Sequence, residues 1–71
     1  MNEHFYFSLY IGGFVANTYA GTRSNARAYF KRWIVKEIPF PDDYDFSICR
    51  FETLEDMLHY SNCLSRVEFT V

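Results

Sequence analysis

Residues 5–19 carry the pattern that most constrains the fold, two alternating runs joined by Gly12-Gly13. In the first run large apolar residues alternate with Tyr and Ser at a period of two, which is typical of a strand with one buried face; the apolar set is Phe5, Phe7, Leu9 and Ile11. A Gly-Gly pair supplies the positive φ angles that a two-residue hairpin turn requires. The sequence therefore begins with a predicted antiparallel hairpin.

The hairpin register follows if Ile11 pairs with Phe14 across the turn. On the apolar face, Leu9 is then opposite Ala16 and Phe7 is opposite Thr18. The other face would hold the pairs Tyr10–Val15, Ser8–Asn17 and Tyr6–Tyr19. Both faces are chemically consistent in this register, so we expect Tyr6, Tyr10 and Tyr19 to share the outer face of the hairpin.

A helix is predicted over residues 25–37, with Ser24 as its N-cap, because the segment that begins at Gly21 interrupts the strand pattern. At 100° per residue one side of this helix faces the core through Ala26, Tyr29, Phe30, Trp33 and the stem of Glu37. The opposite half, which faces solvent, carries Arg27, Lys31, Arg32 and Lys36. The sequence Ile38-Pro39-Phe40-Pro41 ends the helix, because proline excludes the α conformation from the residue before it.

The second half of the chain predicts a strand, a short helix and a final strand. Residues 44–51 form the strand, with Tyr44, Phe46 and Ile48 on one side. Thr53 is the predicted N-cap of a helix over residues 54–62, with acidic residues in the first turn and an inward face of Leu54, Met57, Leu58 and Ser61. The last residues alternate again, Val67, Phe69 and Val71 against Arg66, Glu68 and Thr70.

The resulting order is ββαβαβ, which indicates an α+β domain with a mainly antiparallel sheet and both helices packed on one face. A chain of 71 residues forms one domain, so residues 1–71 are expected to be a single unit. The composition, 49% hydrophobic and 21% aromatic, supplies a dense core and argues against disorder. Strand order stays open, because the two crossovers after the second strand allow more than one arrangement.

The expected location is cytoplasmic. The chain starts without a basic segment, an apolar run of signal type or a small-residue cleavage site, and no apolar stretch is long enough to span a bilayer. Two cysteines, Cys49 and Cys63, are fewer than a small disulfide-dependent secreted domain carries. We therefore expect both to be free thiols.

Charge is unevenly distributed along the chain, although the net charge is only −2. Residues 23–36 hold five basic side chains and no acid; they are Arg23, Arg27, Lys31, Arg32 and Lys36. Residues 37–56 hold seven acids against Arg50 alone, and Asp42, Asp43 and Asp45 are three of them. Either a charged interaction face or internal neutralisation would follow, depending on how the middle of the chain packs.

Three surfaces are candidate partner-binding sites. The first is the tyrosine face, Tyr6, Tyr10 and Tyr19, because Tyr offers a rigid contact area with a polar tip; its alternative is a hairpin stabilised by cross-strand aromatic pairs. The second is the basic helix face, Arg27, Lys31, Arg32 and Lys36, although a solvated helix face is the more common meaning of such a pattern. The third is the acidic segment Asp42, Asp43 and Asp45, which suits mimicry of a phosphate backbone or, more simply, a turn.

Catalytic and metal-binding arrangements are weak in this sequence. Asp56, His59 and Cys63 have a spacing that permits zinc on a continued helix, with Cys49 and His4 as outside ligands, yet no paired close ligands such as Cys-x2-Cys are present. No nucleophile elbow, Gly-rich phosphate cradle or Walker lysine occurs. We therefore expect no enzyme activity, no metal and no cofactor.

The leading hypothesis is a non-catalytic protein-binding module. Small aromatic-rich domains without catalytic motifs are frequent among phage and mobile-element inhibitors of host machinery, anti-CRISPR proteins included, so the expected partner is a host protein or ribonucleoprotein complex, blocked stoichiometrically. A homodimer is a further possibility, and no membrane is expected as a partner. The alternative is a small nucleic-acid-binding accessory protein that uses the basic helix face, although a pI near 5.5 makes nucleic acid the weaker choice.

Overall fold

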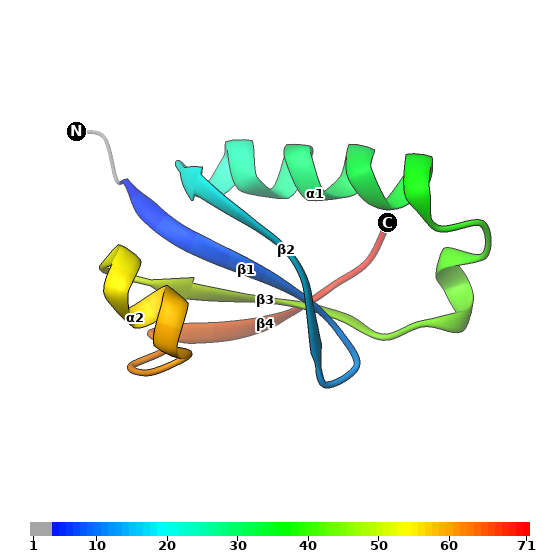
Figure 1. Ribbon diagram of the computed structural model, residues 1–71. Helices are drawn as coiled ribbons and strands as arrows, with labels where there is room; N and C mark the ends of the chain where they lie inside the picture. Colours follow the sequence, from blue (N-terminus) through cyan, green and yellow to red (C-terminus); the bar gives the residue numbers. More distant parts are fainter. Residues whose placement is uncertain (1–3) are drawn as a thin grey trace.

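The computed structural model describes residues 4–71, which form a four-stranded sheet and two helices (Figure 1). The elements in chain order are β1 Phe5–Ile11, β2 Phe14–Gly21, α1 Arg23–Glu37, a 3-10 turn η1 Pro41–Asp43, β3 Phe46–Phe51, α2 Leu54–His59 and β4 Ser65–Phe69. The predicted α+β class and ββαβαβ order are confirmed. Gly12, at φ +60°, provides the left-handed turn that joins β1 to β2.

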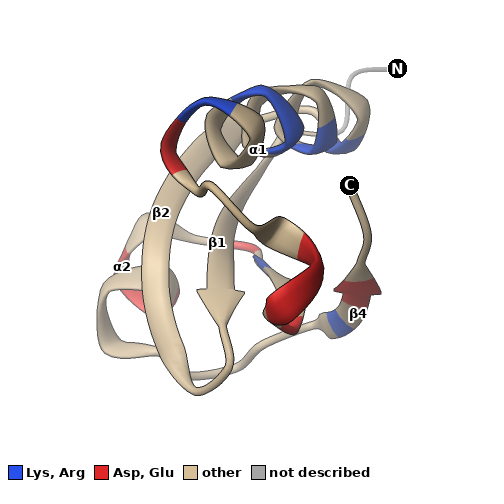
Figure 2. Ribbon diagram, turned by 90° about the vertical axis from the view of Figure 1, so that its right-hand side faces the viewer, with Lys and Arg blue, Asp and Glu red and all other residues tan. Residues whose placement is uncertain are grey.

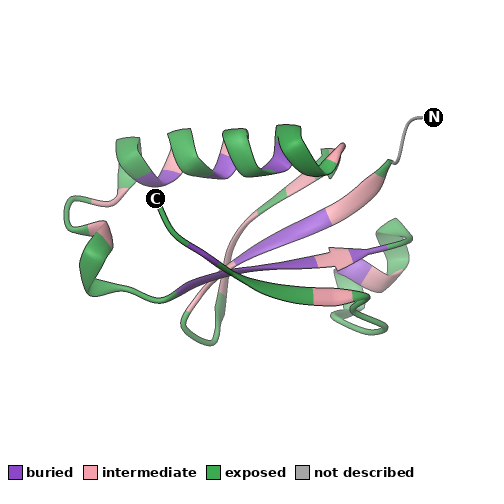
Figure 3. Cartoon of the chain, turned by 180° about the vertical axis from the view of Figure 1, so that it is seen from behind, coloured by how far each residue is buried: buried purple, intermediate pink, exposed green. Residues whose placement is uncertain are grey.

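All strand pairs are antiparallel, and the strand order is β2-β1-β3-β4. In this register Leu9 of β1 lies opposite Ile48 of β3, and Ile48 lies opposite Val67 of β4. The residues between them on each strand, such as Ser8 opposite Cys49, point to the other face. The two central strands, β1 and β3, hold most of the buried sheet residues (Figure 3).

A β-bulge in the hairpin overturns part of the predicted register. Tyr10 does pair with Val15, but beyond it Leu9 lies opposite Asn17 and Phe7 lies opposite Tyr19. The inserted residue moves Tyr19 to the opposite face, because side chains alternate at a period of two. There its ring lies 4.9 Å from that of Tyr29, so packing against α1 stabilises the shifted register.

The helix α1 covers one face of the sheet and builds the main core. Its buried residues Ala26, Phe30 and Ile34 follow one another at intervals of four and pack with Phe7 and Leu9. Tyr29 and Trp33 are half-buried as predicted, whereas Glu37 is exposed. The N-cap is Thr22 rather than Ser24, and its hydroxyl accepts a hydrogen bond from the Asn25 amide at 3.3 Å.

The helix α2 lies against the opposite face, so the expectation that both helices share one face is wrong. Met57 packs with Cys49 and Phe51, whose side chains alternate with those that face α1. In Figure 1, α1 runs above the strands, whereas α2 lies at the left, away from α1 and level with β3 and β4. The first face is already occupied by the fifteen-residue α1, and α2 instead covers Cys49 and Phe51 next to half-buried Tyr6 and Tyr10.

The helix α2 is also shorter than predicted. Thr53 caps it as expected, because its hydroxyl accepts a hydrogen bond from the Asp56 amide at 3.1 Å. It ends at His59 because Tyr60 adopts the left-handed conformation, at φ 54°. Of the four residues predicted to face inward only Met57 is buried, and Leu54 and Leu58 are exposed.

Candidate functional site

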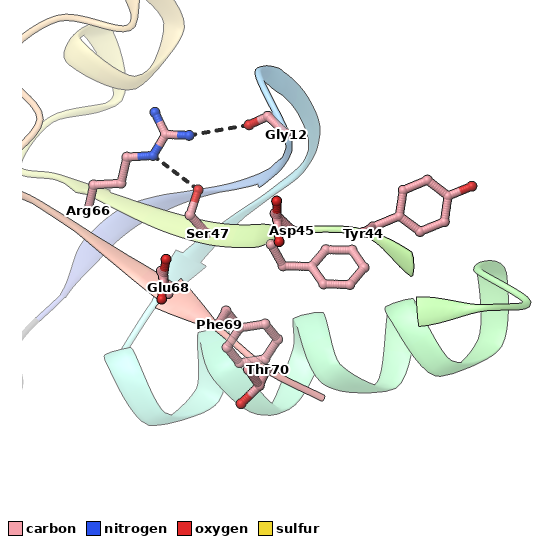
Figure 4. A pocket seen from close by; sticks show the side chains of 9 residues that line it. Gly12, Tyr44, Asp45, Ser47, Arg66, Glu68, Phe69 and Thr70 are labelled. Carbon is pink, nitrogen blue, oxygen red and sulfur yellow. Dashed lines mark hydrogen bonds between the residues drawn. The ribbon is translucent and has the colours of Figure 1, made fainter. Parts of the chain in front are cut away.

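An open cleft of about 500 Å³ lies where the hairpin turn, the start of β3 and the end of β4 meet (Figure 4). Its lining residues are Gly12, Tyr44, Asp45, Phe46, Ser47, Arg66, Glu68, Phe69 and Thr70. Asp45 comes from the predicted acidic segment, and β4 adds a second carboxylate, Glu68. These two acids are far apart in the sequence, and only the β3–β4 pairing brings them together.

Arg66 is fixed in place on the wall of this cleft. Its Nε donates to Ser47 Oγ at 3.0 Å, and a terminal nitrogen donates to the carbonyl of Gly12 at 3.3 Å. The guanidinium also lies over the ring of Tyr10, 4.7 Å from its centroid. These contacts tie β4 to β3 and to the hairpin turn, so we interpret Arg66 as a residue that organises this end of the sheet.

The cleft offers groups for binding more readily than for catalysis. Its lining contains two carboxylates, one guanidinium and the hydroxyls of Tyr44, Ser47 and Thr70, with no His, Cys or Lys. The Ser47 hydroxyl accepts from Arg66, and no imidazole of the lining is placed to activate it. The geometry fits a polar or basic group of a partner.

Exposed apolar side chains around α2 form the second candidate surface, which we call the α2 apolar surface; it consists of Leu54, Leu58, Tyr60 and Leu64. Leu54 and Leu58 are neighbours one helical turn apart, and Tyr60 and Leu64 follow in the connection to β4. Each of the four is close to half exposed or more. Large apolar side chains grouped outside the core are typical of protein contact surfaces.

The three tyrosines of the predicted tyrosine face are separated by the sheet. Tyr6 and Tyr10 lie on the α2 side, half-buried against the cluster of Cys49, Phe51 and Met57. Tyr19 lies on the α1 side, where it packs against Tyr29 and Phe30. The proposed open surface of three tyrosines is therefore absent, and these rings stabilise two different cores.

The basic and acidic segments remain apart in space (Figure 2). Arg23, Lys31, Arg32 and Lys36 are exposed on α1, while Arg27 lies over the ring of Phe69, 5.2 Å from its centroid. Asp42 and Asp43 are exposed in η1 and Asp45 follows them at the cleft. Figure 2 shows the Lys and Arg positions of α1 apart from the acidic turn η1, so the charge separation of the sequence is kept in the fold.

Both cysteines are free thiols, as predicted, and they lie near one another. Burial, with a smaller contribution from the neighbouring Cys63 thiol, raises the pKa of the Cys49 thiol to about 11. Cys63 is exposed, and its thiol donates to the Ser65 carbonyl at 3.2 Å. The helical spacing considered for zinc fails because α2 ends before Cys63, and no group of three potential metal ligands gathers within residues 4–71.

No helix in the described part of the chain is long and apolar enough to cross a membrane. Comparison with protein-family models, with curated proteins and with solved structures finds no match for this chain.

Proposed function

We propose that this chain is a non-enzymatic protein-binding module and that the α2 apolar surface is its main contact. The observation that carries the proposal is the exposure of Leu54 and Leu58, two residues that the sequence pattern assigns to a core. Exposing them costs solubility, and docking against an apolar patch of a partner protein would bury them. This use also explains why a helix of only six residues carries so much apolar surface.

Such a module acts by covering a surface of its partner. Small aromatic-rich domains of this kind are frequent among phage and mobile-element inhibitors, anti-CRISPR proteins included, and in that setting the result would be stoichiometric blockade of a host protein or ribonucleoprotein complex. The affinity then comes mainly from apolar burial, so binding weakens little as the salt concentration rises.

The test compares two variants with equally exposed positions. Leu58 and Val35 are both 63% exposed, but Leu58 lies on α2 and Val35 on α1. Tagged wild type, Leu58→Glu and Val35→Glu proteins are used to capture partners from a bacterial lysate treated with nuclease and washed at high salt. We expect one protein at stoichiometric amounts with wild type and Val35→Glu, and its loss with Leu58→Glu. Equal retention by the two variants would contradict the assignment of the surface.

The second candidate function is nucleic-acid binding through α1, and one observation favours it. Lys31, Arg32 and Lys36 are exposed on α1, and Figure 2 shows the acidic turn η1 apart from this helix. Phosphate binding releases counterions, so retention of nucleic acid should fall roughly tenfold or more between low and high salt. Retention of nucleic acid alone, lost at high salt and in a Lys31→Glu, Arg32→Glu double variant but kept in Leu58→Glu, would establish this candidate in place of the first.

A further inference from the structure

The outer edge of β4 is a free sheet edge in the described chain. The strand order ends at β4, which pairs with β3 on one side and with no described element on the other. Val67, at its centre, is 41% exposed. A strand edge presents unpaired amide and carbonyl groups, and it therefore pairs readily with another strand unless something blocks it.

The backbone groups that point away from this edge can be assigned from two hydrogen bonds. The Leu64 amide donates to the Arg50 carbonyl at 2.8 Å, so the polar groups of Arg50 face β4. The Gly12 amide donates to the Asp45 carbonyl at 2.8 Å, so from Asp45 onward the backbone amides and carbonyls of odd-numbered residues point towards β1. Backbone amides and carbonyls point to alternate sides along a strand. Those of Ile48 therefore point towards β4 and form hydrogen bonds with Val67, the residue opposite. The amides and carbonyls of Arg66 and Glu68 therefore point outward.

The pattern of charged residues on this strand is complementary to that of a second copy, while the Arg66 guanidinium itself extends across β3 to Ser47, Gly12 and Tyr10. Arg66 and Glu68 flank Val67 on the same face of the sheet. In an antiparallel pair centred on Val67, Arg66 of each copy lies opposite Glu68 of the other, and the outward backbone groups of both residues meet. Moving the centre to Arg66 or to Glu68 places two like charges directly opposite each other, which is unfavourable. The sign pattern therefore selects one register and a two-fold axis.

The other sheet edge lacks these properties. The strand β2 contains the bulge near Ala16, which bends and twists the edge, and α1 packs against it. On β4 the paired register with β3 runs without a shift from Ser65 to Phe69. The contacts of Arg66 with Ser47 and Gly12 hold that strand in place, which lowers the entropy lost when a partner strand is added.

We propose that a second copy of this chain docks on β4, antiparallel and centred on Val67, so that the two four-stranded sheets form one continuous sheet. The pairing buries the exposed Val67 side chains against each other and satisfies the backbone groups of Arg66 and Glu68. It leaves Leu54 and Leu58 available, since both lie outside β4, whereas Leu64 directly precedes β4 and borders the pairing. The proposal does not rest on the proposed function, because the latter is carried by the exposure of Leu54 and Leu58.

Charge variants test the register directly. The wild-type protein should sediment at about twice 8.5 kDa at high concentration. Arg66→Glu and Glu68→Arg each place like charges opposite one another, so each should be monomeric alone, and an equimolar mixture should form a heterodimer in native mass spectrometry. Glu55→Arg, an equal charge change on exposed α2, should leave the dimer unchanged, as should Leu58→Glu. A monomeric wild type, or two folded variants that fail to associate when mixed, would overturn the proposal.

Hydrogen exchange of the wild-type protein is a second test, and its result does not depend on whether Arg66→Glu folds. The Arg66 and Glu68 amides should exchange at least about tenfold more slowly at high than at low protein concentration, because only the dimer protects them. The Val67 and Phe69 amides, bonded to β3, should be protected at both concentrations. Protection of Arg66 and Glu68 that does not depend on concentration contradicts the pairing.

Discussion

The two faces of the sheet differ in how much apolar surface their helices bury. On one face the fifteen-residue α1 brings Ala26, Phe30 and Ile34 into the main core. On the other face the six-residue α2 buries Met57 alone and exposes Leu54 and Leu58. The α1 face holds the fold together, whereas the α2 face leaves apolar surface exposed. Under the function proposed above, stability and binding would therefore be carried by different faces of the sheet.

The largest expected effect on the free energy of unfolding comes from truncating one buried side chain on each face to Ala. Phe30 is fully buried, so Phe30→Ala should lower the free energy of unfolding by about 3–5 kcal/mol, comparable to the whole stability of a domain of this size. Met57 is 8% exposed in a smaller cluster, so Met57→Ala should cost about 2 kcal/mol. Urea denaturation followed by circular dichroism measures both. An equal or larger loss for Met57→Ala would invalidate the comparison.

The two threonine N-caps test the difference between the two faces with an effect of intermediate size. Thr22 and Thr53 each accept a backbone hydrogen bond at the start of their helix, and replacing either with Ala should cost about 1 kcal/mol. Because α1 belongs to the main core, Thr22→Ala should lower the global free energy of unfolding. Thr53→Ala should instead speed hydrogen exchange at the Met57 and Leu58 amides, with α1 unchanged. Global destabilisation of similar size by both variants would contradict separate roles for the helices.

The pH dependence of stability should report on the α2 face through Cys49. The pKa of its thiol is about 11 in the folded chain and near the ordinary value of 9.0 when unfolded. Between these values the folded chain keeps a proton that the unfolded chain has lost, so stability is complete below pH 9 and falls as the pH rises towards 11. Cys49→Ala should fall less steeply over this range.

The reactivity of the two thiols provides the control for that pH effect. Exposed Cys63 should react with iodoacetamide at pH 8 in the folded protein, and buried, protonated Cys49 should react only after unfolding. Mass spectrometry of the labelled peptides distinguishes the two sites. Fast labelling of Cys49 in the folded protein would show that α2 does not cover it.

The smallest expected effect concerns the serines beneath the α2 face. The Ser8 hydroxyl is buried with no hydrogen-bond partner in the described chain, so Ser8→Ala should stabilise the protein, by less than about 1 kcal/mol. Ser47→Ala is the matched control, because it removes the acceptor of Arg66 and should destabilise by about 1 kcal/mol. Calorimetric melting temperatures that move in the same direction for both variants would contradict this difference.

Local signals predicted the elements of this fold well. The alternation of residues 5–11, the Gly12-Gly13 turn and the Thr53 cap act over a few residues, and each is confirmed. The burial of Ile34 could also have been predicted from the sequence, because Ala26, Phe30 and Ile34 recur at helical spacing. Elements whose signals are local were therefore predictable from the sequence.

The arrangement of the candidate surfaces depends on contacts between distant segments, which a local pattern does not contain. The bulge moves Tyr19 to the α1 face because it packs there against Tyr29, ten residues later. The helix α2 ends because Tyr60 adopts a left-handed conformation. Gly or Asn is the usual sequence signal for such a helix end, and Tyr is not. The exposure of Leu54 and Leu58 follows from that short helix. Sequence periodicity placed both residues in a core that α2 is too short to complete.

The most direct test of the division between the two faces is to measure both stability and partner capture for Leu58→Glu, with Val35→Glu as the control. Both side chains are equally exposed, so both variants should unfold within about 0.5 kcal/mol of the wild type, while Leu58→Glu alone loses the partner. A loss of several kcal/mol in Leu58→Glu would show that Leu58 belongs to a core. Unchanged stability together with unchanged capture would show that the α2 face does not bind the partner.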